Sequence, residues 1–215
     1  MRWDSFHQAA QTIQQEIKRE KLPAASVMFG GDSNVGKTSM FLYYFRGESH
    51  PEYVPIKVEA DHGPIVYTYK ESGKKVGIYY NDCDGGGEDW HRLRPLGYDR
   101  ADVVVLCFSI RCRRSFENID EYWYPMVQKH APKAPIVLCG TKLDTRFHDN
   151  GPEEHTVKLI TNFEGAKMAQ KINALGYYEC STREGKGVKE LFDAAAEATN
   201  AAFRMKNKTE KCLMM

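Results

Sequence analysis

The sequence has no excess charge of one sign, no long hydrophobic run and no N-terminal signal peptide. Its 30 lysine and arginine residues are balanced by 29 aspartate and glutamate residues, which argues against a nucleic-acid-binding protein because such proteins normally carry a basic excess. No apolar run reaches the roughly 18 residues that a membrane-spanning helix needs, and no signal peptide opens the chain. We expect a cytoplasmic protein that is a monomer and has no nucleic-acid partner.

The cysteines also lack a pattern, since their spacing fits neither a metal site nor a disulfide framework. Several of them lie inside apolar runs, which favours free thiols in a reducing compartment. Internal repeats and low-complexity segments are absent too. At 215 residues, the chain is long enough for one α/β domain with modest extensions. The cysteines are Cys83, Cys107, Cys112, Cys139, Cys180 and Cys212.

The stretch from Gly31 to Thr38 matches the phosphate-binding pattern G-x-x-x-x-G-K-S/T in full. Its glycines let the backbone curl so that successive N–H groups point at phosphate oxygens. We expect Lys37 to reach the β- and γ-phosphates and the Thr38 hydroxyl to ligate Mg²⁺. The predicted phosphate-binding residues are Ser33, Asn34, Val35, Gly36, Lys37, Thr38 and Ser39.

Strand and helix patterns alternate along the chain. The predicted strands cover 26–29, 65–69, 76–80, 102–110, 136–140 and 177–180, and the predicted helices cover 39–45, 116–130, 163–174 and 188–203. The second and third strands flank a Ser72-Gly73 turn and form a hairpin. The alternation predicts an α/β fold of the P-loop NTPase class, a doubly wound, mostly parallel six-stranded sheet with helices on both faces.

A candidate guanine-reading loop, Thr141-Lys142-Leu143-Asp144, follows the predicted strand 136–140. The Asp144 carboxylate can accept hydrogen bonds from N1 and N2 of guanine, two donors that adenine does not offer. The aliphatic stem of Lys142 is expected to lie along the purine face. The segment after the last predicted strand is expected to give a backbone N–H to guanine O6. That segment is Ser181, Thr182 and Arg183.

Further segments follow at a spacing typical of one family. They are Glu88–Leu96, Ser115–Asn118, Trp123–Pro125 and Pro135–Leu138. Together with the phosphate loop and Asp144, they make the chain resemble the small G domain of the Ras superfamily, and within it the Rho family, over roughly residues 26–215. The resemblance implies GTP or GDP with Mg²⁺ as ligands. It also implies effector proteins that bind through two switch segments, and exchange factors and dissociation inhibitors as regulators.

The second switch departs from the family's D-T-A-G-Q-E, because the chain has one residue more between Asp82 and Glu88. The family pattern implies that Asp82 holds Mg²⁺ through water, with Asp84 as the alternative acid. Gly87 stands where the family has the glutamine that orients the attacking water. Glycine has no side chain with which to do this.

Other positions of the hydrolytic apparatus also differ. Ile56 replaces the first-switch threonine that contacts Mg²⁺ and the γ-phosphate. Ser33 replaces a glycine that leaves room for the glutamine and for an inserted arginine. His50 stands where an aromatic residue usually covers the guanine edge and is a substitute for it. We therefore hypothesise a Rho-like switch, in cytoskeletal or polarity signalling, that binds guanine nucleotide but hydrolyses GTP very slowly.

Two alternatives to a slow switch stay open. In the first, Asp84 or a residue from a partner orients the water, and the chain is a working GTPase. In the second, Ile56 and Asp84 disfavour GTP, and the chain is a binding scaffold locked on GDP or free of nucleotide.

Both ends extend beyond the predicted domain, which we place at 23–203 with a Rho-type insert near 145–159. In residues 1–22, apolar residues at helical spacing predict an amphipathic helix. This helix is expected to dock on the domain, contact a partner or touch a membrane. Its apolar residues are Phe6, Ala10, Ile13 and Ile17.

Residues 204–215 form a basic tail that ends in Cys212-Leu213-Met214-Met215, a C-a-a-X motif. We expect a farnesyl or geranylgeranyl group on Cys212. Because one lipid chain anchors only marginally, the basic residues supply a second signal for the cytoplasmic face of the plasma membrane.

Overall fold

The computed structural model describes residues 3–47, 64–82, 97–147 and 158–213, apart from the side chains of residues 3–7, 9, 46 and 206–213. The strands are β1 (Ala24–Gly30), β2 (Pro64–Thr68), β3 (Lys75–Asp82), β4 (Val103–Ser109), β5 (Ile136–Thr141) and β6 (Tyr177–Glu179). The helices are α1 (Trp3–Arg19), α2 (Lys37–Arg46), α4 (Arg113–Asn118), α5 (Tyr124–His130), α6 (Asn162–Lys171) and α7 (Val188–Leu213). Two shorter turns are the π-helical η1 (Ile119–Trp123) and the 3₁₀-helical η2 (Leu143–Arg146).

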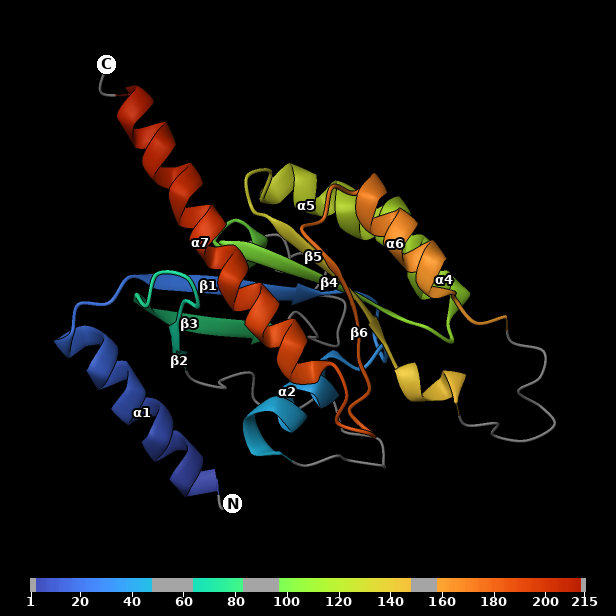
Figure 1. Cartoon of the computed structure of the whole chain (residues 1–215), viewed down its shortest axis with the longest axis horizontal. Helices are drawn as coiled ribbons and strands as arrows, with labels where there is room; N and C mark the ends of the chain where they lie inside the picture. Colours follow the sequence, from blue (N-terminus) through green and yellow to red (C-terminus); the bar gives the residue numbers. More distant parts are fainter. Residues whose placement is uncertain (1–2, 48–63, 83–96, 148–157, 214–215) are drawn as a thin grey trace.

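The six strands form one sheet in the order β2-β3-β1-β4-β5-β6 (Figure 1). β2 and β3 pair antiparallel as a hairpin, and every other neighbouring pair is parallel. Strand order extends in both directions from β1, which is the arrangement of a doubly wound sheet. The prediction of a mostly parallel six-stranded α/β sheet is therefore confirmed.

The central strand β4 is buried on both faces, and its side chains alternate between two cores. Val103 and Val105 belong to the core between the sheet and the helices α2 and α7. Val104 and Leu106 belong to the core beneath α4, η1, α5 and α6. A strand covered on both faces has to be apolar throughout, which is why its sequence is a continuous hydrophobic run.

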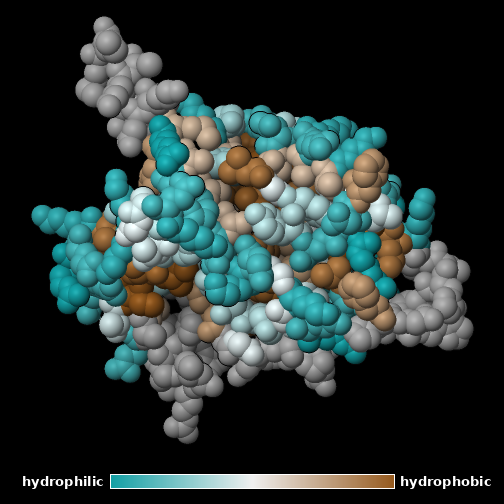
Figure 2. All heavy atoms as spheres, in the orientation of Figure 1, coloured by the Kyte–Doolittle hydropathy of each residue, from teal (hydrophilic) through white to brown (hydrophobic). Residues whose placement is uncertain are grey.

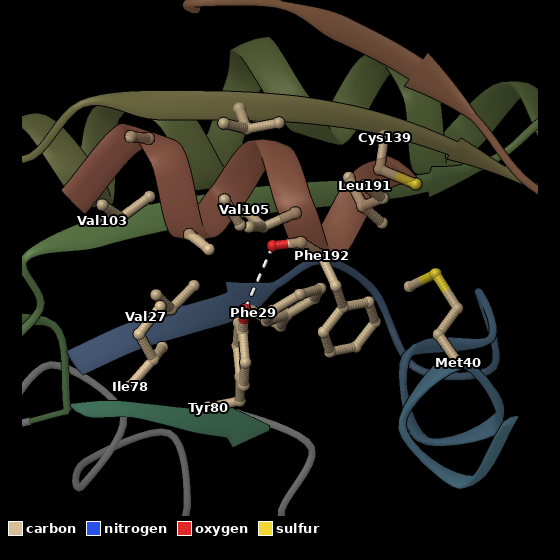
Figure 3. Close-up of a cluster of buried hydrophobic side chains, with 14 of the residues drawn as sticks. Val27, Phe29, Met40, Ile78, Tyr80, Val103, Val105, Cys139, Leu191 and Phe192 are labelled. Carbon is tan, nitrogen blue, oxygen red and sulfur yellow. Dashed lines mark hydrogen bonds between the residues drawn. The ribbon is translucent and has the colours of Figure 1, made fainter. Parts of the chain in front are cut away.

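Aromatic side chains fill the first of these cores (Figure 3). The ring of Phe192 on α7 stacks on Phe29 of β1, with ring centroids 5.2 Å apart. The buried Tyr80 hydroxyl donates to the Phe192 backbone oxygen at 3.0 Å. This contact satisfies the polar end of a buried tyrosine. The helix α7 is thereby fixed across the sheet that carries the functional loops.

The N-terminal helix α1 packs on the β2–β3 hairpin through its last turns. Ile17 is only 5% exposed and lies against Gly77, where an added Cβ would come within 2.6 Å of Ile17 Cδ1. Lys75 pairs with Glu16 and Glu20 at 3.7 and 3.2 Å. Figure 2 shows apolar side chains gathered where α1 meets this hairpin.

Some element boundaries differ from the predicted ones. The predicted helix 116–130 is α4, η1 and α5 in succession, with a π-helical turn in the middle. At the C-terminus, α7 continues to Leu213, so the helix does not break where we placed the boundary between the domain and its tail. The reason is that the segment after residue 203 contains neither glycine nor proline. In the described part of the chain, no helix has the length and hydropathy needed to cross a membrane.

Candidate functional site

The candidate site lies at the edge of the sheet where the parallel strands end. β1 ends at Gly30, β4 at Ser109, β5 at Thr141 and β6 at Glu179. Because these strands are parallel, the loops that follow them lie at one edge, where ligands of doubly wound folds bind. The sequence-predicted phosphate loop and both guanine-reading segments come from these loops.

The phosphate loop curls because its backbone visits the left-handed region. Gly31 has φ 141° and Gly36 has φ 106°, and Asn34 between them has φ 62°. A Cβ on Gly31 would lie 2.1 Å from the Cys107 backbone oxygen, so that only glycine fits between the loop and β4. The turn leads directly into the N-terminus of α2, whose free N–H groups favour an anion.

The Lys37 ammonium lies across this loop. Lys37 is 1% exposed, and its Nζ donates to the backbone oxygens of Gly31 at 2.8 Å and Asp32 at 2.7 Å. These two bonds hold the ammonium against the backbone of the phosphate loop. A buried ammonium at a helix N-terminus fits the negative charge of a nucleotide phosphate group.

The residues proposed as Mg²⁺ ligands meet at the same place. The Thr38 hydroxyl at the start of α2 donates to the Asp82 carboxylate at the end of β3, at 2.7 Å. Hydroxyl, carboxylate and phosphate oxygens are the donors that Mg²⁺ prefers, and these residues fit that ion. The alternative acid, Asp84, lies outside the described residues.

On the base side, the Asp144 carboxylate is already held in position. Its Oδ1 accepts a hydrogen bond from the buried Ser181 hydroxyl at 2.7 Å. Ser181 Oγ in turn accepts from the Glu184 backbone N–H at 3.1 Å. In the same segment Thr182 is half-buried and Arg183 is exposed. The structure thus brings together the two guanine-reading segments, which are 37 residues apart in sequence.

Lys142 and Thr141 join the base side to the phosphate loop. Lys142, at φ 59°, donates from Nζ to the Asn34 backbone oxygen at 2.8 Å. Burial lowers the pKa of Lys142, and the nearby Arg111 charge lowers it further. The buried Thr141 hydroxyl donates to the Val35 backbone oxygen. The predicted guanine-reading loop therefore also fixes the predicted phosphate loop.

One contact of the phosphate loop was not foreseen from the sequence. The Asp32 carboxylate accepts hydrogen bonds from Asn118 Nδ2 at 2.6 Å and from Trp123 Nε1 at 2.7 Å. Asn118 and Trp123 stand in segments quoted above for the family resemblance, yet nothing in their sequence pattern links them to Asp32. Only Pro125, which disturbs a regular helix, marks this region in the sequence.

The remaining predicted residues are placed as follows. Ser33 is exposed at the mouth of the phosphate loop, and Ser39 is half-buried in α2. His50, Ile56 and Gly87 lie outside the described residues. Cys212 belongs to α7, but its side chain is outside the described part.

The comparison with protein families agrees with this geometry. The family model described as the Ras family matches residues 26–201. The match runs from β1 into α7 and includes the phosphate loop, Asp82, Asp144 and Ser181, whereas α1 precedes it. Proteins of this family are guanine-nucleotide switches that bind GTP or GDP with Mg²⁺, and their regulators and effectors are proteins. The chain belongs to the Ras family of small GTPases.

Proposed function

We propose that this protein is a Rho-like switch that binds GTP and GDP with Mg²⁺ but hydrolyses GTP very slowly. The observation that carries the proposal is a contrast within one site. The Thr38–Asp82 and Asp144–Ser181 contacts, at 2.7 Å each, assemble the groups for binding. The residues that differ from the family are those for hydrolysis.

Binding is supported by residues on three elements, α2, β3 and η2. Lys37 supplies a positive charge for the phosphates, Thr38 and Asp82 supply oxygens for Mg²⁺, and Asp144 supplies an acceptor for guanine. Asp144 is half-buried and preoriented by Ser181, and leaving such a carboxylate without the guanine donors is costly, so it should reject adenine by a factor of about 10⁴. These side chains are the reason to favour a nucleotide-binding protein over an empty scaffold.

Slow hydrolysis is supported by the sequence. Phosphoryl transfer to water depends on positioning and electrostatic stabilisation. Gly87 offers no side chain to orient water, and Ile56 offers no hydroxyl to Mg²⁺ or the γ-phosphate. Ser33 adds a side chain at the mouth of the loop, where it is exposed. Because three residues of the same hydrolytic apparatus differ from the family, independent neutral drift at each position is a poor explanation.

The Rho assignment and the membrane address are further parts of the proposal. The first rests on the family-like segments around Ser115–Asn118 and Trp123–Pro125. The second rests on the C-a-a-X motif at Cys212 and on the basic residues before it. Switch-dependent effectors at a membrane surface, in cytoskeletal or polarity signalling, would follow from both.

The test begins with the full chain purified from its native cells. Extraction and chromatography identify the bound nucleotide as GTP, GDP or none. Single-turnover hydrolysis of loaded GTP is then compared with the triple variant S33G/I56T/G87Q. We expect slow cleavage in the wild type and acceleration of about 10-fold or more in the variant.

The outcomes separate the three functions considered above. Fast wild-type cleavage supports a working GTPase and contradicts the proposal. Bound GDP that GTP cannot replace, or no nucleotide at all, supports the scaffold. Mass spectrometry of the C-terminal peptide tests prenylation of Cys212, and an unmodified cysteine would contradict the proposed membrane anchoring.

A further inference from the structure

The phosphate loop is hydrogen-bonded to the helical segment α4–η1, which packs on the face of the sheet opposite α2 and α7. Asp32 Oδ2 accepts from Asn118 Nδ2 at 2.6 Å, and Asp32 Oδ1 accepts from Trp123 Nε1 at 2.7 Å. Both carboxylate oxygens are therefore engaged, one by each donor. Hydrogen bonds of this kind, with an ionised acceptor, are about twice as strong as neutral ones.

The π-helical turn explains how two donors five residues apart reach one carboxylate. In an α-helix, residues i and i+5 point about 140° apart. Here the Tyr124 N–H bonds to the Ile119 oxygen, an i−5 contact, and the wider turn brings Asn118 and Trp123 to one face. Pro125 has no N–H to close the regular α-helical ladder. Such turns occur often at functional sites.

Asp32 is also the residue whose backbone holds Lys37. The Lys37 Nζ donates to the Asp32 backbone oxygen at 2.7 Å, and the next residues, Ser33 to Val35, present the loop amides. Moving Asp32 therefore moves both the ammonium and the start of the amide cradle. Trp123 is 2% exposed, so the anchor on the helical side is fixed in the core.

From this geometry we propose that Asn118 and Trp123, acting through Asp32, are positioning residues for nucleotide binding. They hold the phosphate loop in its binding conformation before the ligand arrives. Neither residue needs to touch the nucleotide. The inference rests on the proposed function, because it describes how the same site retains a guanine nucleotide.

A role in positioning differs from a role of the Asp32 charge. Asparagine at position 32 removes the charge but keeps Oδ1 as the acceptor for the Trp123 indole. Its Nδ2 can donate to Asn118 Oδ1 after the Asn118 side-chain amide flips. Alanine removes charge and anchor together. Positioning therefore predicts that D32N recovers most of what D32A loses, whereas a charge role predicts that the two variants behave alike.

The experiment measures the dissociation rate of a fluorescent GDP from the full chain in Mg²⁺, chased with excess GDP. Thermal unfolding of the same proteins is recorded without nucleotide. We expect D32A and W123F to release GDP about 10-fold faster, and N118A to do so by a smaller factor. The control is D120N, which alters the neighbouring ion pair between Asp120 of η1 and Lys171 of α6 and should leave the rate unchanged.

A swapped pair adds a readout that lost stability alone cannot imitate. N118D places two carboxylates against each other and should accelerate GDP release. D32N/N118D restores a donor facing an acceptor. Its GDP release should be slower than that of N118D and slower than the rate expected from adding the two single effects.

The outcomes distinguish this inference from the proposed function. If the wild type holds GDP and D32A, W123F and N118A release it at the wild-type rate, the positioning role is wrong and the proposed function stands. Equal losses in D32A and D32N, without rescue in the swapped pair, also overturn it. A wild type that holds no guanine nucleotide overturns both.

Discussion

Two sides of the proposed nucleotide site, the base side around Asp144 and the γ-phosphate side around Ser33, differ in how many of the family's functional residues they keep under our proposal. On the base side, Asp144 is oriented by Ser181, and Lys142 reaches back to Asn34 at 2.8 Å. On the proposed γ-phosphate side, Ser33 is the described residue that we propose to replace a family glycine. Its counterparts Ile56 and Gly87 lie outside the described residues. Asp144 and Ser33 lie on different loops that are hydrogen-bonded to each other through Lys142 and Asn34, and we propose that the first keeps its recognition role while the second has lost a hydrolytic one.

The largest expected effect is on the base side. Replacing Asp144 by alanine removes the acceptor for guanine N1 and N2, and GDP affinity should fall by about 10³- to 10⁴-fold. Competition between GDP and ADP measures the loss of discrimination. The control D99A removes an exposed carboxylate elsewhere and should not change Kd. Retained preference for GDP in D144A would break the assignment of the base side.

The second prediction concerns the phosphate side. T38A removes the hydroxyl that contacts Asp82, and GDP affinity in Mg²⁺ should fall by about 10²-fold because a ligand to the ion is lost. In EDTA the variant and the wild type should bind alike. A variant that keeps the full gain from Mg²⁺ would show that the ion is held by other groups.

The third prediction tests whether a loss of global stability alone changes nucleotide binding at either side of the site. Ile17 fastens α1 to the hairpin at Gly77, and I17A should lower the free energy of unfolding by about 2 kcal/mol. GDP release should stay at the wild-type rate, since Ile17 packs on Gly77 near the start of β3, whereas the site lies where the strands end. I13A, at a half-buried position of the same helix, should cost less. Faster GDP release in I17A would mean that α1 acts on the site.

The smallest effect provides a baseline far from both sides. Arg113 at 2.8 Å, and then the Thr161 backbone and hydroxyl, lower the pKa of Glu164 from 4.5 to about 2. A lowered carboxyl pKa contributes stability that is complete above the unfolded value and is lost as the pH falls through the folded value.

We therefore expect wild type and E164Q to differ by about 1 kcal/mol or less near neutral pH, with the difference shrinking from about pH 4.5 toward pH 2. Urea unfolding at several pH values measures this. E121Q, at the more exposed Arg114–Glu121 pair, is the matched control. A difference that does not depend on pH would contradict the ionic explanation.

The parts of the molecule predicted from sequence are those with local signals. The continuous apolar run of β4 requires cover on both faces, and the glycines of the phosphate loop require a curled backbone. Asp144 was identified because it follows a strand of a phosphate-loop domain. In each case, the residues that determine the feature are neighbours in the chain.

The anchor on Asp32 could not be predicted in the same way. Its partners are 86 and 91 residues away, and in isolation Asn118 reads as a surface amide and Trp123 as a core aromatic residue. Their meeting depends on a π-helical turn and on how the helices pack over β4. The contact of Ile17 with Gly77 is likewise set by tertiary packing rather than by periodicity.

The described cysteines differ in how accessible they are to thiol reagents. Burial, together with contacts to Cys107 and Cys180, raises the pKa of the Cys139 thiol well above its ordinary value, and all three of these residues are buried. Cys112, at the start of α4, is the exposed member of the four described cysteines. With Cys83 and Cys212 replaced by serine, a maleimide dye should attach at Cys112. That dye would sit six residues before Asn118, where it reports optically on the loop that holds the phosphates.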